Sequence, residues 1–213
     1  MSDILEQLGQ HVIDMDPEGT KELTQNALDD GIEAEEILNE GLIPAMDKVG
    51  DEYESGDRYV PEMLLSAEAM KEAMKLLRPK LAESGVKPTG TIVIGTVEGD
   101  LHDIGQNLVA MMLEGAGFDV INLGTETPAE EFVEAVKEKD VNLLGMSALL
   151  TTTMTHMPEV IEALEEAGVR DKVKIIIGGA PVSQDYAEEI GADGYAPDAA
   201  SASKVAKKMI GVA

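Results

Sequence analysis

The residues best suited to chemistry lie in residues 97–105, which read Val-Glu-Gly-Asp-Leu-His-Asp-Ile-Gly. Asp100 and His102 are separated by one residue, in a glycine-bounded loop that directly follows a hydrophobic run at 91–97. A carboxylate beside an imidazole can accept one ring N–H, which orients the ring and leaves the other nitrogen free to bind a metal. The spacing therefore predicts a metal-binding histidine that is oriented by an aspartate.

The other two histidines have no comparable motif. His11 and His156 lack a matching carboxylate pattern nearby, which favours ordinary helix positions for both. Glu98 and Asp103 are more typical of a solvated loop than of a separate metal site. His102 is therefore the candidate ligand.

Composition excludes several classes of site and partner. The chain has 213 residues and no cysteine, so disulfides, thiolate zinc sites, iron–sulfur clusters and cysteine nucleophiles are excluded. Its net charge of −26 argues against nucleic acid and anionic membranes as partners. No basic start precedes an apolar run, and no stretch approaches membrane-spanning length. We expect a cytoplasmic protein with no nucleic-acid or membrane partner.

The first part of the chain, residues 1–86, has the periodicity of helices. Apolar residues recur at three- and four-residue spacing in 18–28 and 34–49, the pattern of amphipathic helices. A longer helical pattern covers 59–81, with Pro61 tolerated in its first turn. We expect an N-terminal domain of four helices, packed as an antiparallel bundle.

The second part, residues 90–213, follows a linker that contains glycine and proline. Strands are predicted at 91–97, 118–123, 141–147, 173–178 and near 193–196, and helices at 104–116, 128–139, 153–167, 184–190 and from 199 onward. Strands that alternate with helices favour a parallel, doubly wound sheet. The expected fold is α plus α/β, with a four-helix bundle cap followed by a flavodoxin-like, five-stranded sheet domain.

Three loops at one edge of this sheet carry the unusual residues. Doubly wound sheets bind ligands at the carboxyl ends of their strands, where the strand order reverses. The loops after the first, third and fourth predicted strands begin at Glu98, Ser147 and Gly178. Taken singly, the hydroxyl residues could be helix caps and the glycine pair a simple turn. No glycine-rich phosphate-binding motif is present, so a nucleotide site is not supported.

Taken together, the three loops resemble the cobalamin-binding signature of corrinoid proteins. The matching residues are Asp100-x-His102-x-x-Gly105, Ser147-x-Leu149 and Gly178-Gly179. Residues 42–50 and 59–63 look like the helical cap of methyltransferase corrinoid proteins, so the resemblance covers nearly the whole chain. The chain is similar to the small corrinoid subunits of methylamine, methanol and quaternary-amine systems, and to the cobalamin module of methionine synthase.

The resemblance implies a role for each matching residue. His102 would be the lower axial ligand of cobalt in a base-off, His-on cobalamin or related corrinoid. Asp100 would accept the other ring N–H, and Thr153 would complete the relay at a position where methionine synthase has a serine. Further contacts to the cofactor are implied for Asp103, Ile104, Gly105, Ser147, Leu149, Thr151, Gly178 and Gly179. Cap residues over the reactive cobalt face would be Tyr53, Tyr59, Val60 and Met63.

The implied function is that of a corrinoid methyl carrier in one-carbon metabolism, as in anaerobic methylotrophy. Co(I) would accept a methyl group from a substrate:corrinoid methyltransferase. The methyl-Co(III) form would pass it to a methylcorrinoid:acceptor methyltransferase, with coenzyme M or tetrahydrofolate as acceptor, and a reductive activator would rescue oxidised cobalt. We expect a subunit of a methyltransferase system that is not a complete enzyme alone.

Two other functions fit parts of the sequence. A phosphoacceptor receiver domain shares the sheet and the acidic loops, but it expects a lysine after the last strand, where residues 194–198 contain none. A cobalamin-dependent mutase subunit would lack the helical cap predicted at 34–83. Both rank below the methyl carrier.

Overall fold

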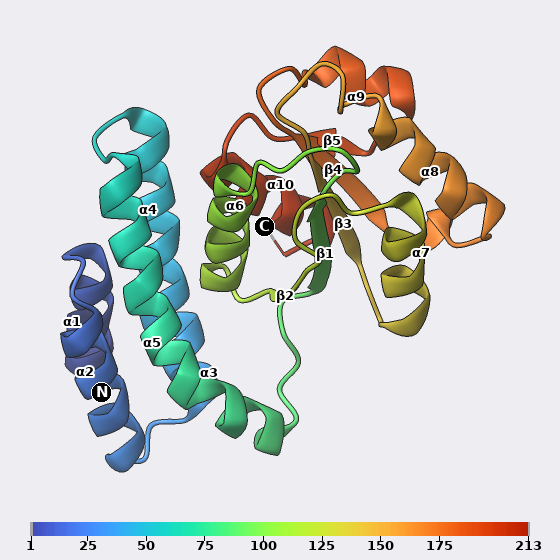
Figure 1. Cartoon of the computed structure of the whole chain (residues 1–213). Helices are drawn as coiled ribbons and strands as arrows, with labels where there is room; N and C mark the ends of the chain where they lie inside the picture. Colours follow the sequence, from blue (N-terminus) through green and yellow to red (C-terminus); the bar gives the residue numbers. More distant parts are fainter. Residues whose placement is uncertain (1, 213) are drawn as a thin grey trace. The chain divides into compact units, whose positions relative to one another are not determined.

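The computed structural model describes residues 2–212 and divides the chain into two compact units (Figure 1). The helical unit runs to Pro88 and includes Glu114–Gly117. The sheet unit comprises Thr89–Leu113 and the chain from Phe118 onward. None of the helices within residues 2–212 is long and apolar enough to cross a membrane.

The helical unit is built from four long helices joined by short connections. Its elements are α1 (Ser2–Ile13), α2 (Pro17–Asp29), α3 (Ala34–Glu36), the π-helical segment η1 (Ile37–Leu42), α4 (Ile43–Ser55) and α5 (Val60–Ser84). Apolar side chains at helical spacing form its core, among them Leu8, Val12, Met46, Met70 and Leu77. The predicted bundle is therefore present.

One predicted helix is longer than the sequence indicated. The helix expected at 34–49 is formed by α3, η1 and α4, which follow one another without a break. Its last part, α4, continues to Ser55. Gly56 ends it with a φ of 81°, a left-handed conformation that glycine adopts without steric cost.

The sheet unit has five parallel strands in the order β2-β1-β3-β4-β5. The strands are β1 (Thr91–Thr96), β2 (Asp119–Asn122), β3 (Leu143–Ser147), β4 (Lys174–Gly178) and β5 (Gly194–Tyr195). Helical segments between and after them are α6 (Ile104–Gly115), α7 (Ala129–Glu138), α8 (His156–Glu166), the short 3-10 helix η2 (Arg170–Lys172), α9 (Gln184–Ile190) and α10 (Ala199–Met209). The predicted doubly wound, flavodoxin-like sheet is confirmed, with element ends that shift by a few residues.

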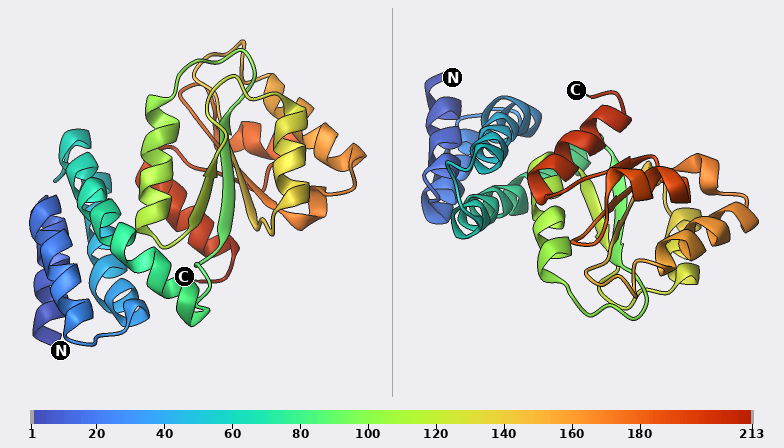
Figure 2. Two further views of the ribbon diagram at one scale, coloured as in Figure 1. Left: turned by 60° about the horizontal axis from the view of Figure 1, so that its bottom comes forward. Right: turned by 90° about the horizontal axis from the view of Figure 1, so that it is seen from above.

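Helices cover both faces of this sheet (Figure 2). On one face α7, α8 and α9 pack against the central strands, where Phe132, Leu144 and Leu164 are fully buried. On the other face lie α6 and α10. Because the chain enters at β1, turns to β2 and then returns to β3 on the other side, the strand order reverses between β1 and β3. In sheets with such a reversal, ligands bind at the carboxyl ends of the two strands between which the order reverses.

Candidate functional site

Asp100 lies in the loop after β1, at this edge of the sheet, and its side chain has no exposed surface. Its Oδ1 accepts hydrogen bonds from Nδ1 of His102 at 2.6 Å and from the backbone N–H of His102 at 3.1 Å. Its Oδ2 accepts from the hydroxyl of Thr153 at 2.6 Å and from the backbone N–H of Leu149 at 2.7 Å. One buried carboxylate therefore joins the loop after β1 to the loop after β3.

The protonation of Asp100 decides which nitrogen of His102 is free. Burial raises the pKa of Asp100, but hydrogen bonds from Thr153, Leu149 and His102 outweigh it and hold the pKa well below its usual range. An ionised carboxylate only accepts hydrogen bonds, so Nδ1 of His102 carries the hydrogen. The lone pair then lies on Nε2, which has no partner among residues 2–212, on a side chain that is 50% exposed.

A carboxylate beside the ring does not by itself distinguish His102 from the other histidines. Nδ1 of His11 lies 2.9 Å from Asp16, and Nδ1 of His156 lies 2.8 Å from Glu159. Both histidines lie in helices as expected, in α1 and α8, and their carboxylate partners follow no motif like that of Asp100 and His102. The Asp16 and Glu159 side chains are 45% and 60% exposed, however, whereas that of Asp100 is fully buried. Burial of the orienting carboxylate sets His102 apart.

The loop after β3 folds differently from the prediction. A helix was expected from residue 153, but α8 begins at His156. The hydroxyl of Thr153 is directed to Asp100, and its backbone N–H donates to the carbonyl of Leu150 at 3.2 Å. The segment before α8 is therefore held as a loop that closes over the buried carboxylate.

The end of β4 brings the third predicted loop to the same edge. Strand register places Thr96, Ser147 and Gly178 beside one another. A Cβ on Gly179 would lie 1.8 Å from the carbonyl oxygen of Ala148, and Gly179 has a φ of 122°. The backbone of the neighbouring loop thus requires glycine here.

Gly105 differs from Gly179, because a Cβ built there would meet no atom within 4 Å. The open space beside Gly105 lies in the first turn of α6, next to His102. This glycine is not explained by contacts within the protein.

Exposed apolar side chains surround His102. Ile104 is 80% exposed and Leu101 is 68% exposed, and on the facing loop Leu149 and Leu150 are also exposed. Asp103 and Thr151 are exposed as well, whereas Ser147 is half-buried. Leu101 and Leu150 were not predicted as site residues. A large apolar residue in a loop, outside any periodic element, could have indicated them. Apolar side chains that remain exposed in this way are typical of a binding surface.

The four predicted cap residues lie in the helical unit, in α4 and at the start of α5. Tyr59 is 71% exposed, Val60 is exposed and Tyr53 is half-buried, but Met63 is fully buried in the bundle core. The neighbouring Leu64 and Leu65, which the sequence analysis did not name, are exposed instead.

A buried arginine supports the start of α5. Arg58 donates to Glu52 at 2.7 Å, to the hydroxyl of Ser66 at 3.0 Å and to the carbonyl of Ile13 at 2.9 Å. These contacts join the turn before Tyr59 to three other parts of the bundle. The exposed apolar residues that follow are therefore presented from a well-supported turn.

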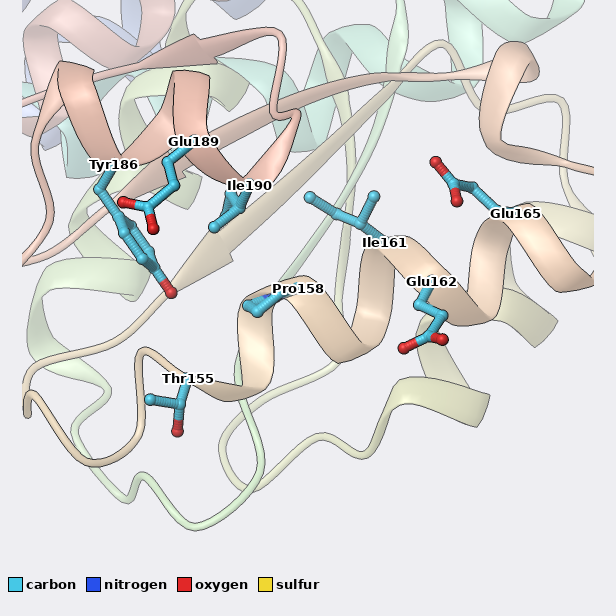
Figure 3. Close-up of a pocket in the computed structure, with 8 residues that line it drawn as sticks. All are labelled: Thr155, Pro158, Ile161, Glu162, Glu165, Tyr186, Glu189 and Ile190. Atoms are coloured by element: carbon cyan, nitrogen blue, oxygen red, sulfur yellow. The ribbon is translucent and has the colours of Figure 1, made fainter.

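A separate open pocket of about 540 Å³ lies between α8 and α9 (Figure 3). Its lining residues are Thr155, Pro158, Ile161, Glu162, Glu165, Tyr186, Glu189 and Ile190. The hydroxyl of Tyr186 donates to the carbonyl of Met154 at 2.8 Å. None of the lining residues contributes to the hydrogen bonds around Asp100, so this pocket is distinct from the candidate site.

Comparison with known proteins assigns both parts of the chain. Two family models, each described as a B12 binding domain, match residues 4–78 and residues 90–204. The chain is 42% identical over 211 residues to a corrinoid protein of Desulfitobacterium hafniense (strain Y51), covering 98% of each chain. It is 41% identical over 212 residues to the trimethylamine corrinoid protein of Methanosarcina barkeri, covering 99% of this chain and 98% of the relative.

A solved structure agrees with these matches. The methanol:cobalamin methyltransferase complex of Methanosarcina barkeri contains a chain with a TM-score of 0.86 and 31% identity, covering 99% of this chain and 81% of that chain. Because both family models match and the relatives align over nearly the full length, the chain belongs to the cobalamin-binding corrinoid proteins of methyltransferase systems.

Proposed function

We propose that this chain carries methyl groups on the cobalt of a bound corrinoid, with His102 as the lower axial ligand. The observation that carries the proposal is the free Nε2 of His102, held by the fully buried Asp100. The relatives named as trimethylamine and dimethylamine corrinoid proteins support a methyl-carrier role.

The residues at the sheet edge fit a corrinoid. A flat macrocycle whose edge carries methyl and amide groups needs one nitrogen ligand for its metal and apolar side chains that pack against its ring and methyl groups. The protein offers Nε2 of His102 and a surrounding surface of Leu101, Ile104, Leu149 and Leu150. The open space at Gly105 leaves room for part of a ligand beside the first turn of α6.

When bound, the corrinoid supplies a cobalt that takes up and releases a methyl group, while the protein supplies binding and orientation. Nε2 of His102 would hold the metal. Asp100 keeps the hydrogen on Nδ1 and fixes the ring plane, and Thr153 holds Asp100. Ser147, Thr151, Gly178 and Gly179 would line the space for the tail of the cofactor.

The two predicted domains, 1–86 and 90–213, would have different roles, with the metal ligand in the second and an apolar cover in the first. We assign the upper face of the corrinoid to exposed apolar residues of the helical domain, with Tyr59, Val60, Leu64 and Leu65 as its contacts. An apolar cover of this kind excludes water from a reactive metal centre. Of the four cap residues predicted from sequence, Met63 would act from within the core, by supporting this surface.

The proposed partners are enzymes that the chain itself does not contain. The likeness to a methanol:cobalamin methyltransferase complex supports a substrate:corrinoid methyltransferase as one partner. A second methyltransferase that passes the methyl group to coenzyme M or tetrahydrofolate, and a reductive activator, complete the proposed cycle.

The test is a methyl-uptake assay with the intact chain loaded with hydroxocobalamin and reduced. We expect one corrinoid per chain, and methylation only when a substrate:corrinoid methyltransferase and its methyl donor are both present. Trimethylamine, dimethylamine, monomethylamine and methanol form the donor panel, and absorption spectroscopy follows the cobalt.

His102→Ala is the informative variant, and His156→Ala is its matched control because His156 also has a carboxylate partner. We expect only the first to change the absorption of the loaded protein. The proposal fails if wild type binds no corrinoid, or if no donor with its methyltransferase methylates it.

A further inference from the structure

Thr96, the last residue of β1, connects the sheet to the loop that carries His102. It is fully buried, and its main chain is fixed on both sides. Its N–H donates to the carbonyl of Gly124 at 2.9 Å, and its carbonyl accepts from the N–H of Thr127 at 2.9 Å. The hydroxyl of Thr96 lies 3.1 Å from the carbonyl oxygen of His102 and donates to it.

A side-chain network that runs from the exposed Asn122 to the buried Gln106 sets the direction of this hydrogen bond. Oδ1 of Asn122 accepts from the N–H of Gly124 at 2.9 Å and from Nε2 of Gln106 at 2.7 Å. Gln106 therefore turns its Oε1 toward Thr96, at 3.3 Å from the hydroxyl. Since both atoms facing Thr96 are acceptors, its hydroxyl can act toward them only as a donor.

His102 is thus held at three atoms. Nδ1 and the backbone N–H both donate to Asp100, and the carbonyl accepts from Thr96. Among residues 2–212 no other group donates to this carbonyl. Asp100 fixes the ring relative to the loop after β3, whereas Thr96 fixes the backbone of the same residue relative to β1.

We propose that Thr96 is a positioning residue of the corrinoid site, which acts through the main chain of His102. This inference rests on the proposed role of His102 as the cobalt ligand. A metal–ligand bond requires the ligand atom within a few tenths of an ångström, so a backbone anchor that limits movement of His102 favours the bound state. Without the hydroxyl, the carbonyl of His102 loses its donor and the loop loosens.

The first experiment uses the cofactor-free protein, so it does not depend on corrinoid binding. Thr96→Val removes the hydroxyl at nearly constant volume. We expect amide hydrogen exchange at His102 to become about two- to tenfold faster, the factor that the loss of one net hydrogen bond corresponds to. Thr96→Ser keeps the hydroxyl and should restore the wild-type exchange rate.

Thr127→Val is the matched control. Thr127 is also buried, its hydroxyl donates to the carbonyl of Gly124 at 3.3 Å, and its side chain makes no hydrogen bond to His102. Both valine variants delete one buried hydroxyl at the same sheet edge, and unfolding by denaturant compares their overall stability. Only Thr96→Val should speed exchange at His102.

The second readout is the ratio of His-bound to His-free cobalt in the hydroxocobalamin-loaded protein, followed by absorption. We expect Thr96→Val to lower this ratio about two- to tenfold, with Thr96→Ser and Thr127→Val unchanged. If Thr96→Val matches Thr127→Val in both readouts, the positioning role is overturned. If wild type shows no His-bound cobalt, the proposed ligand role fails instead, and amide exchange still decides whether Thr96 anchors His102.

Discussion

Two aspartates at opposite ends of the same sheet, the buried Asp100 and the partly exposed Asp193, show how one residue type serves two purposes. Asp193, directly before β5, lies at the amino ends of the strands, and Asp100 lies at their carboxyl ends. Asp193 accepts from Arg170, from Lys174 and from the backbone N–H of Ile175, each at 2.8 Å. Asp100 has comparable hydrogen bonds, but its donors are a hydroxyl, two backbone N–H groups and one imidazole.

Charge balance is the difference between them. Two permanent cations compensate Asp193, so that end of the sheet is a closed ion-pair network. No lysine or arginine among the described residues pairs with Asp100, and its one ionisable partner, His102, extends into solvent. The cation pairs at the amino end favour a role in stability, whereas we propose that the charge of Asp100 at the carboxyl end acts on a ligand through His102.

Substitution of Asp193 should have the largest effect on stability. Asp193→Ala removes the acceptor of the Ile175 N–H and the carboxylate partner of Arg170 and Lys174, and removal of one member of a partly buried ion pair is costly. We expect the free energy of unfolding to fall by about 2–3 kcal/mol, below the fully buried case because the site is partly solvated. Denaturant titration measures it, and corrinoid coordination should be unchanged. A larger effect on corrinoid coordination than on stability would contradict the stabilising role given to the amino ends of the strands.

Substitution of Asp100 should act mainly on the ligand. Asp100→Asn keeps the shape but places an amide where only an acceptor fits, so the ring of His102 loses its orientation. We expect corrinoid affinity to fall about 10- to 100-fold, as for other partners that orient a metal ligand. Equilibrium binding of hydroxocobalamin measures it, with Asp193→Asn as the matched control. Equal corrinoid affinity in the two variants would show that Asp100 does not orient the metal ligand.

Gly105 tests whether the open space at the carboxyl end is reserved for a ligand. Gly105→Ala meets no protein atom, and alanine favours helix over glycine by up to about 1 kcal/mol. We expect unchanged or higher stability, together with corrinoid affinity lower by a factor of about three, a loss below 1 kcal/mol. Thermal unfolding and binding titration measure the two. Unchanged affinity would show that the ligand does not use this space.

The smallest expected effect is on the pH dependence of the free energy of unfolding at acidic pH. Burial raises the pKa of Asp193, but Lys174, the Ile175 N–H and Arg170 lower it more, so the pKa of this carboxyl lies below its usual value. A carboxyl with a lowered pKa stabilises the fold above its unfolded pKa, and this contribution is lost as pH falls through the folded value. Below about pH 4, Asp193→Asn should therefore lose stability less steeply than wild type. Parallel curves for the two proteins would contradict this.

The fold could be predicted because its signals are local. Alternation of strands and helices and the glycine-containing linker are visible as periodicity and composition, and this alternation predicted the parallel, doubly wound sheet. The continuation of the helix at 34–49 to Ser55 could not be predicted, because a π-helical segment shifts the helical phase at 37–42. The late start of α8 was missed for a different reason, since Thr153 bonds to Asp100, far away in sequence.

The residues of the site could be predicted from their motif, but their burial and contacts could not. The spacing of Asp100 and His102 indicated the pair, yet His11 and His156 also have carboxylate partners that the sequence did not reveal. Burial separates these pairs, and burial depends on the packing of strands distant in sequence. The role of Thr96 could not be predicted either, because its sequence context is that of an ordinary strand residue and its contact with His102 depends on the fold.

The most direct test of the His102 assignment is electron paramagnetic resonance of the Co(II) form of the bound corrinoid, in protein containing 15N-labelled histidine. We expect the splitting from the axial nitrogen to change from that of 14N to that of 15N. It should disappear in His102→Ala and persist in His11→Ala and His156→Ala. A splitting that does not respond to labelled histidine, or that survives in His102→Ala, would contradict the assignment.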